Sequence, residues 1–175
     1  MVITDLKKLP KQIIVDLINY DNDTSLEVEL LTFAKPVVTN SKFNTSLVIS
    51  SVPDAHYVGS VTLKYDRIDI RTVVGDKSVN IPIGNATKLS ELIPKINAHF
   101  GINLTPDDYI NSDLPTLDSN VDEIKSFNIT MHPHSLIYLK DLNLYAVKSE
   151  LLLSSVITRR ILNGLKYIEP ARYFI

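Results

Sequence analysis

The sequence predicts an α+β domain over residues 1–148, with an antiparallel β-sheet or small β-sandwich and two main helices packed on it. Apolar residues recur at helical spacing in two segments, near residues 5–20 and 88–100. Elsewhere the chain reads as short alternating stretches, about six to eight strands, separated by turn-forming residues. Residues 149–175 differ in character and are predicted to be a C-terminal extension.

The first predicted helix, near 5–20, shows one apolar face. Ile13, Ile14, Leu17 and Ile18 lie on the same side of a helix. Pro10 suits the first turn, where its missing N–H group costs nothing. The turn-forming stretch YDNDT then ends the helix.

Strands are predicted next, at 25–33, 43–52 and 57–70. In the last of these, Val61, Leu63 and Tyr65 alternate with polar residues, and the apolar residues then change parity after Arg67. This phase slip favours a β-bulge, and a break into two strands is the alternative. Within 73–83 we expect a turn at Gly75-Asp76 and a short strand beyond it.

The second predicted helix, 88–100, has a continuous apolar stripe. Thr87 can cap it, Gly101 can end it, and Pro94 implies a kink or a start near Ser90. One or two helical turns are predicted at 104–110, with Thr105 as the N-cap and Asp107 and Asp108 complementing the dipole. A polar loop, 111–123, precedes two predicted strands, 126–131 and 136–147, which the sequence HPHS connects.

Composition excludes several function classes. The 175-residue chain has a net charge of −2 and no cysteine, so thiolate metal sites, disulfides and cysteine nucleophiles are absent. No basic stripe predicts nucleic-acid binding, and no apolar run reaches the roughly 18 residues that a membrane span needs. We therefore expect a soluble protein that binds neither nucleic acid nor membrane.

Catalytic motifs are also missing. No G-x-S-x-G, P-loop or G-x-G-x-x-G sequence occurs. His132 and His134 could share a face, but Pro133 separates them and no third metal ligand is near. The carboxylates of Asp107 and Asp108 are adjacent, which suits capping better than acid–base catalysis. The sequence thus predicts no catalytic, metal or cofactor site.

The extension 149–175 is the candidate binding segment. Its first part reads either as a helix or as a hairpin turning at Asn163-Gly164. Its apolar end would be a liability in water, so we expect it to be buried against its own domain or a neighbour. The candidate partner-binding residues are Arg159, Arg160, Tyr167, Tyr173, Phe174 and Ile175.

Three stretches together resemble a known group of proteins: IIVDLINYDNDTSLEVELLTF, FNTSLVISSVPDAHYVGSVTLKYDRIDI and LSELIPKINAHFGINLTPDDYI. Over about residues 10–147, the chain resembles small structural proteins from virions of large tailed bacteriophages. The resemblance implies a capsid decoration, a neck or collar part, or a tail or baseplate part, made in the host bacterial cytoplasm. It implies no enzymatic residues, and its expected partners are other virion proteins and copies of the chain.

Two alternatives stay open. The first is a host- or carbohydrate-binding module of a phage tail, in which exposed Tyr57, Tyr65 or Tyr138 would stack on sugars. The second is an early host-directed protein, an enzyme or an inhibitor, that is absent from particles.

Overall fold

The computed structural model describes residues 5–53, 55–75, 79–117 and 123–148, and in these it confirms the α+β class. In chain order the elements are α1 (Pro10–Asn22), the 3-10 helix η1 (Val28–Leu30), β1 (Leu31–Phe33), β2 (Val37–Val38), β3 (Thr45–Ser51), β4 (Ser60–Tyr65), β5 (Ile68–Asp69), α2 (Ile70–Val74), β6 (Asn80–Pro82), α3 (Leu89–Phe100), β7 (Ile124–Thr130), β8 (Tyr138–Leu139) and β9 (Asp141–Val147). No helix of this described part is long and apolar enough to cross a membrane. The predicted extension, 149–175, lies outside the described residues, so its helix or hairpin stays a prediction.

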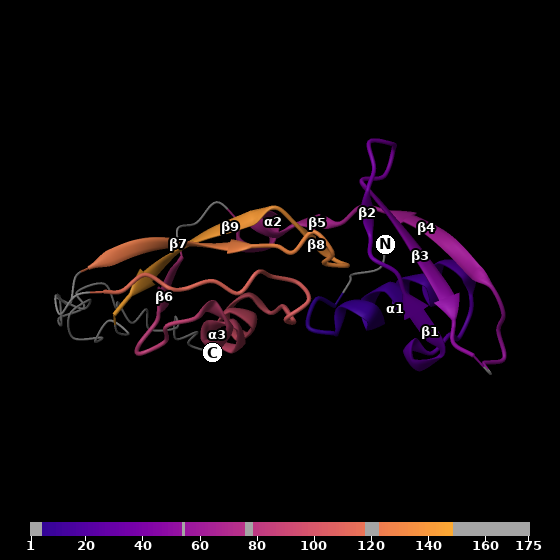
Figure 1. Ribbon diagram of the computed structural model, residues 1–175, viewed down its shortest axis with the longest axis horizontal. Coiled ribbons are helices and arrows are strands. Elements are labelled where there is room, and N and C mark those ends of the chain that lie inside the picture. Colours follow the sequence, from indigo (N-terminus) through magenta and orange to yellow (C-terminus); the bar gives the residue numbers. More distant parts are fainter. Residues whose placement is uncertain (1–4, 54, 76–78, 118–122, 149–175) are drawn as a thin grey trace, which may run out of the picture.

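The described chain forms two lobes that lie side by side along the long axis of the molecule (Figure 1). We call α1 and β1–β4 the first lobe, and α3, β6, β7 and β9 the second lobe. The short strands β5 and β8 lie between them, and α2 lies beside β9 (Figure 1). The chain therefore crosses from one lobe to the other directly after β4.

The sheet of the first lobe is built on β3. Strands β1, β2 and β4 all pair with β3 in antiparallel orientation, β4 along one edge and β1 and β2 along the other. Leu47 and Ile49 of β3 are buried and belong to the same hydrophobic cluster as Ile13 and Ile14 of α1. The apolar face predicted for the first helix is thus the face that joins the core.

The sheet of the second lobe is built on β9. Strand β7 pairs with β9 antiparallel and β6 pairs with it parallel; β5 and β8 form a further parallel pair. Leu142 and Leu144 of β9 are buried in the cluster that includes the stripe of α3: Leu89, Leu92, Ile93 and Ile96. The sequence predicted an antiparallel sheet, and the parallel pairs β5–β8 and β6–β9 depart from that prediction.

The phase slip after Tyr65 marks a change of sheet. Strand β4 ends at Tyr65, and β5 begins at Ile68 in a different sheet, so the preferred β-bulge was wrong and the break into two strands was right. Arg67, between the two strands, is only 4% exposed. The apolar residues change parity because each strand faces a different part of the core.

The predicted strand 25–33 was wrong over most of its length. A 3-10 helix occupies 28–30, and only 31–33 form a strand. The carboxamide of Asn19 donates to Leu26 O (2.9 Å) and accepts from Leu26 N (2.7 Å). This tether holds the segment against the end of α1 and overrides its alternating pattern.

The helix predicted at 88–100 is confirmed as α3, with Pro94 inside it. Lys88, rather than Thr87, occupies the cap position, and the side chain of Glu91 accepts from the backbone N–H groups of both residues. Gly101 ends the helix with a φ of 65°, in the left-handed region that favours glycine.

Candidate functional site

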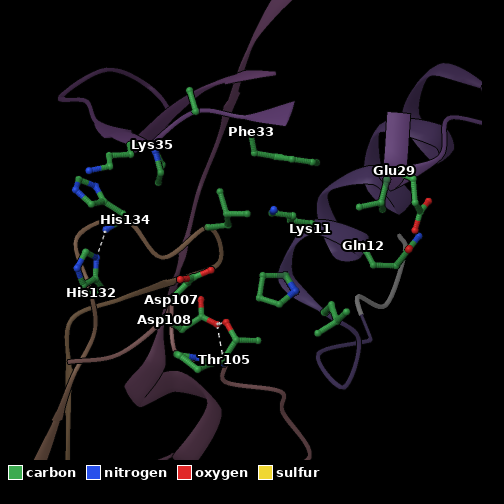
Figure 2. Close-up of a pocket in the computed structure, with 17 residues that line it drawn as sticks. Lys11, Gln12, Glu29, Phe33, Lys35, Thr105, Asp107, Asp108, His132 and His134 are labelled. Carbon is green, nitrogen blue, oxygen red and sulfur yellow. Dashed lines mark hydrogen bonds between the residues drawn. The ribbon is translucent and has the colours of Figure 1, made fainter. Parts of the chain in front are cut away.

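A cleft of about 570 Å³ opens between the two lobes. Figure 2 shows His132, His134 and Lys35 on one side and Gln12 and Glu29 on the other, with Lys11 between them. The lining residues come from α1, from the segment around η1 and β1, and from two loops of the second lobe: Leu9, Pro10, Lys11, Gln12, Val28, Glu29, Phe33, Ala34, Lys35, Pro36, Thr105, Pro106, Asp107, Asp108, His132, His134 and Leu136. The cleft thus combines apolar walls with charges of both signs.

Asp108 is a buried carboxylate at the edge of this cleft, only 1% exposed. Its Oδ2 accepts from the backbone N and the hydroxyl of Thr105 (2.9 and 2.7 Å). Its Oδ1 accepts from the Ser135 hydroxyl at 2.6 Å, and its backbone oxygen accepts from His132 N at 2.8 Å. Asp108 therefore ties the loop at 105–108 to the loop at 132–135.

These bonds correct the sequence prediction for 104–110. Thr105 does not cap a helix there; instead its hydroxyl donates to Asp108, and a turn closes with Asp108 N donating to Thr105 O. A carboxylate that accepts both donors of Thr105 stabilises the turn in place of a helical continuation.

Arg67 fixes the same loop from the first lobe's side. Its Nε donates to the Thr45 hydroxyl of β3 at 3.0 Å. Its Nη1 donates to the backbone oxygens of Pro133 (2.9 Å) and Ser135 (2.8 Å). One planar guanidinium thus joins β3 of the first lobe to the 132–138 loop of the second, and we call this contact the Arg67 joint.

Two further bonds reinforce the Arg67 joint. The Tyr65 hydroxyl donates to Leu136 O at 2.7 Å, and Ile68 N donates to Ile137 O at 2.7 Å. Burial raises the pKa of Tyr65 to about 12, and the positive charge of Arg67 offsets part of that rise. The joint therefore uses both side chains and backbone from the end of β4 and the start of β5.

Three buried polar atoms in the described part of the chain have no hydrogen-bond partner: Arg67 Nη2, His134 Nδ1 and Tyr138 Oη. All three belong to the Arg67 joint or to the loop that it holds. Desolvation lowers the pKa of Arg67 and of His134 and raises that of Tyr138, and nearby Lys35 lowers the pKa of His134 further. The joint is consequently a desolvated site in which charge is costly.

The histidine pair is arranged as a turn. His134 N donates to His132 Nδ1 at 3.1 Å, and the ring centroids are 5.0 Å apart. Within the described residues no group of three His, Cys, Asp or Glu side chains is placed to hold a metal ion. The two rings shape one wall of the cleft.

The remaining ionisable groups of the cleft do not converge on one point. Lys11 Nζ lies 5.7 Å from the centroid of the Phe33 ring, a cation–π distance. Thr105 carries the one hydroxyl among the lining residues that the structure describes, and it is bound to Asp108. The described lining residues therefore hold no free hydroxyl of the kind that a serine-type nucleophile needs.

Replacing Tyr65 with phenylalanine tests the joint through pH. The loss of the bond to Leu136 O should lower the free energy of unfolding by roughly 1 kcal/mol at neutral pH. Because the folded-state pKa of Tyr65 is raised from 10.0 to about 12, its stabilising contribution is present below pH 10 and lost as the pH rises through 12. Between pH 10 and pH 12 the free energy of unfolding should therefore fall less in the variant than in the wild type. Urea unfolding at several pH values measures this difference.

The control for this variant is Tyr20→Phe, because Tyr20 is 63% exposed. It should leave the free energy of unfolding at neutral pH unchanged. Equal stabilities for the two variants at neutral pH would show that the Tyr65 hydroxyl bond contributes nothing.

The structure separates several residues that the sequence grouped. Tyr65 is half-buried and Tyr138 is 1% exposed, so of the three tyrosines suggested for stacking on sugars only Tyr57, at 45%, is open to solvent. On either side of Arg67, Asp66 accepts from Asn44 N, and Asp69 caps α2. The side-chain hydrogen bond from Arg71 lowers the pKa of Asp69 to about 2.

From the sequence alone, we did not predict that Arg67 joins the two lobes or that Asp108 ties two loops together. The signal for Arg67 was present, because an arginine fell where the alternation required an apolar residue. The candidate partner-binding residues all lie in 149–175, outside the described residues: Arg159, Arg160, Tyr167, Tyr173, Phe174 and Ile175.

The chain belongs to a protein family described as a family of unknown function (DUF7941), whose model matches residues 3–172. No curated protein matches the chain, and no solved structure matches it.

Proposed function

We propose that the protein is a non-enzymatic structural component of a tailed-phage virion, acting through contacts with other virion proteins and with copies of itself. Its place would be a capsid decoration, a neck or collar part, or a tail or baseplate part. The observation that carries the proposal is the cleft between the lobes, where Asp108 and Thr105 hold two loops together and apolar side chains such as Leu9 line the open wall.

The first support is the use of the polar groups. Asp108 and the Thr105 hydroxyl bind each other, and His132 Nδ1 accepts from the backbone of His134. These bonds hold the loops at 105–108 and 132–135 in place. Leu9 and Phe33, in contrast, offer apolar surface of the kind that covers a protein partner.

The second support is the rigidity of the connection between the lobes. Arg67 donates to both the first lobe and the loop of the second lobe, and Asp108 holds that loop from the other side. A part that repeats on a symmetric shell or tube must present its contacts at a fixed relative geometry. A two-lobed body with a buried joint meets that requirement.

The third element of the proposal is the segment 149–175 as a docking arm. Its apolar residues and the pair Arg159-Arg160 suit burial against a neighbouring protein. We propose that the arm of one copy docks on a neighbouring virion protein.

The test is quantitative mass spectrometry of purified particles, with the copy number set against the major capsid protein and infected-cell lysate as the reference. The proposal expects the chain in particles: hundreds of copies would indicate a capsid decoration or a tube-wide part, and fewer would indicate a neck, collar or baseplate. A chain abundant in the lysate and absent from the particles would contradict the proposal and favour the host-directed alternative.

A further inference from the structure

Strand β4 has an open edge. It pairs with β3 along one side, and no other described strand pairs with its second side. Ser51 N donates to Gly59 O at 3.1 Å, which fixes the hydrogen-bonding phase of the ladder. Since bonded and non-bonded pairs alternate in an antiparallel ladder, the backbone groups of Ser60, Thr62 and Lys64 point away from β3, toward the open edge.

The side chains of β4 divide cleanly between the two faces of the sheet. Val61 and Leu63 stand opposite the buried residues Ile49 and Leu47 of β3, so they lie on the core side. Thr62 and Lys64 lie on the solvent side. Val61 is nevertheless 52% exposed, because the core-side face of the sheet ends at β4 without a cover.

We propose that a second copy of this chain pairs with β4 in antiparallel orientation about a two-fold axis at Thr62, making one continuous sheet across two protomers. Thr62 would stand opposite Thr62 of the second copy, and Ser60 opposite its Lys64. The outward-facing N–H and C=O groups of these residues then meet in three bonded pairs, for about six hydrogen bonds. The exposed Val61 is covered by Leu63 of the second copy.

The residue pattern favours a second copy as the occupant, because β4 is complementary to itself in this register. In this register the core-side residues Val61 and Leu63 of one copy stand opposite those of the other. A shift of one residue would place core-side residues opposite solvent-side residues. Lys64 faces a serine, whereas a parallel, in-register pairing would place the two Lys64 side chains together and repel. A two-fold contact uses the same patch on both copies, as closed dimers do.

This inference deepens the proposed function by naming one partner, and it rests on that function only for its purpose. The experiment uses the purified full chain, so its result is independent of whether the chain occurs in particles. If the purified chain is a dimer but is absent from particles, the proposed virion function fails and the dimer stands. If the chain is present in particles but is a monomer, the dimer fails and the virion function stands.

The experiment exploits the absence of cysteine from the chain. Thr62→Cys places two thiols opposite each other, at a Cα separation of about 5.5 Å that a disulfide can span. Mild oxidation should convert most of this variant to a covalent dimer. The control is Val48→Cys on the solvent side of β3, which is 40% exposed and away from the open edge, and it should stay monomeric on a non-reducing gel.

A second pair of variants tests the association without oxidation. Light scattering should find the wild type dimeric, Val61→Lys monomeric with an unchanged circular dichroism spectrum, and Val48→Lys dimeric. A wild type that is monomeric at every concentration, or a dimer that survives Val61→Lys, would overturn the proposal. Oxidative cross-linking of the Val48→Cys variant as efficient as that of the Thr62→Cys variant would overturn it as well.

Discussion

Replacing Arg67 with methionine should lower the free energy of unfolding by roughly 3 kcal/mol or more. Methionine fills a similar volume but donates no hydrogen bond. The backbone oxygens of Pro133 and Ser135 would then lose the donor that now lies 2.9 and 2.8 Å away. Each acceptor left unpaired in a buried site costs roughly 1–3 kcal/mol, which is why the effect should be large.

The measurement is urea unfolding followed by circular dichroism, with two comparison variants. Arg67→Lys keeps the charge but cannot reach both lobes at once, and it should recover only part of the loss. Arg71→Met is the matched control, because Arg71 has a 60% exposed side chain and pairs with Asp69 near the surface. Its cost should be much smaller than that of Arg67→Met, because exposed ion pairs contribute little to stability. If Arg67→Met were as stable as Arg71→Met, the Arg67 joint would not hold the lobes.

Replacing Asp108 with alanine should cost roughly 2–4 kcal/mol, because three donors lose a buried acceptor. Asp108→Asn should cost less: its carboxamide keeps one acceptor for Thr105, and its amino group can donate to the Ser135 hydroxyl. Unfolding by urea gives both values.

The neighbouring residue supplies the control for Asp108. Asp107 is exposed, and Asp107→Ala should change the free energy of unfolding by no more than roughly 0.5 kcal/mol. Two adjacent aspartates with such different effects cannot be explained by net charge. Equal effects for the two alanine variants would show that the bonds of Asp108 do not stabilise the loops of the cleft.

Much of the fold could be predicted because local pattern and tertiary packing agree. The stripe of α3 is continuous, and Gly101 occupies the left-handed position that ends it. The parity change after Tyr65 was visible in the sequence, and one of its two readings was right. The segment 25–33 failed because the tether from Asn19 outweighs a weak alternating pattern.

The sequence marked Arg67 as out of pattern, but it could not show what Arg67 and Asp108 bind. Arg67 binds oxygens that lie 66 and 68 residues later in the chain, and Asp108 binds a hydroxyl 27 residues later. Spacing carries no information about contacts at that separation, since they depend on how the lobes meet. The pairing of β5 with β8 was hidden for the same reason: a two-residue strand has no pattern of its own.

Cross-linking mass spectrometry of intact, purified particles tests most directly whether the protein works through contacts with other virion proteins. An amine-reactive reagent should join Lys166 of the proposed docking arm to a lysine of a different virion protein. The account predicts such a link reproducibly, together with links between neighbouring proteins elsewhere in the particle. Particles in which other neighbours cross-link, while this chain links to no other protein, would contradict it.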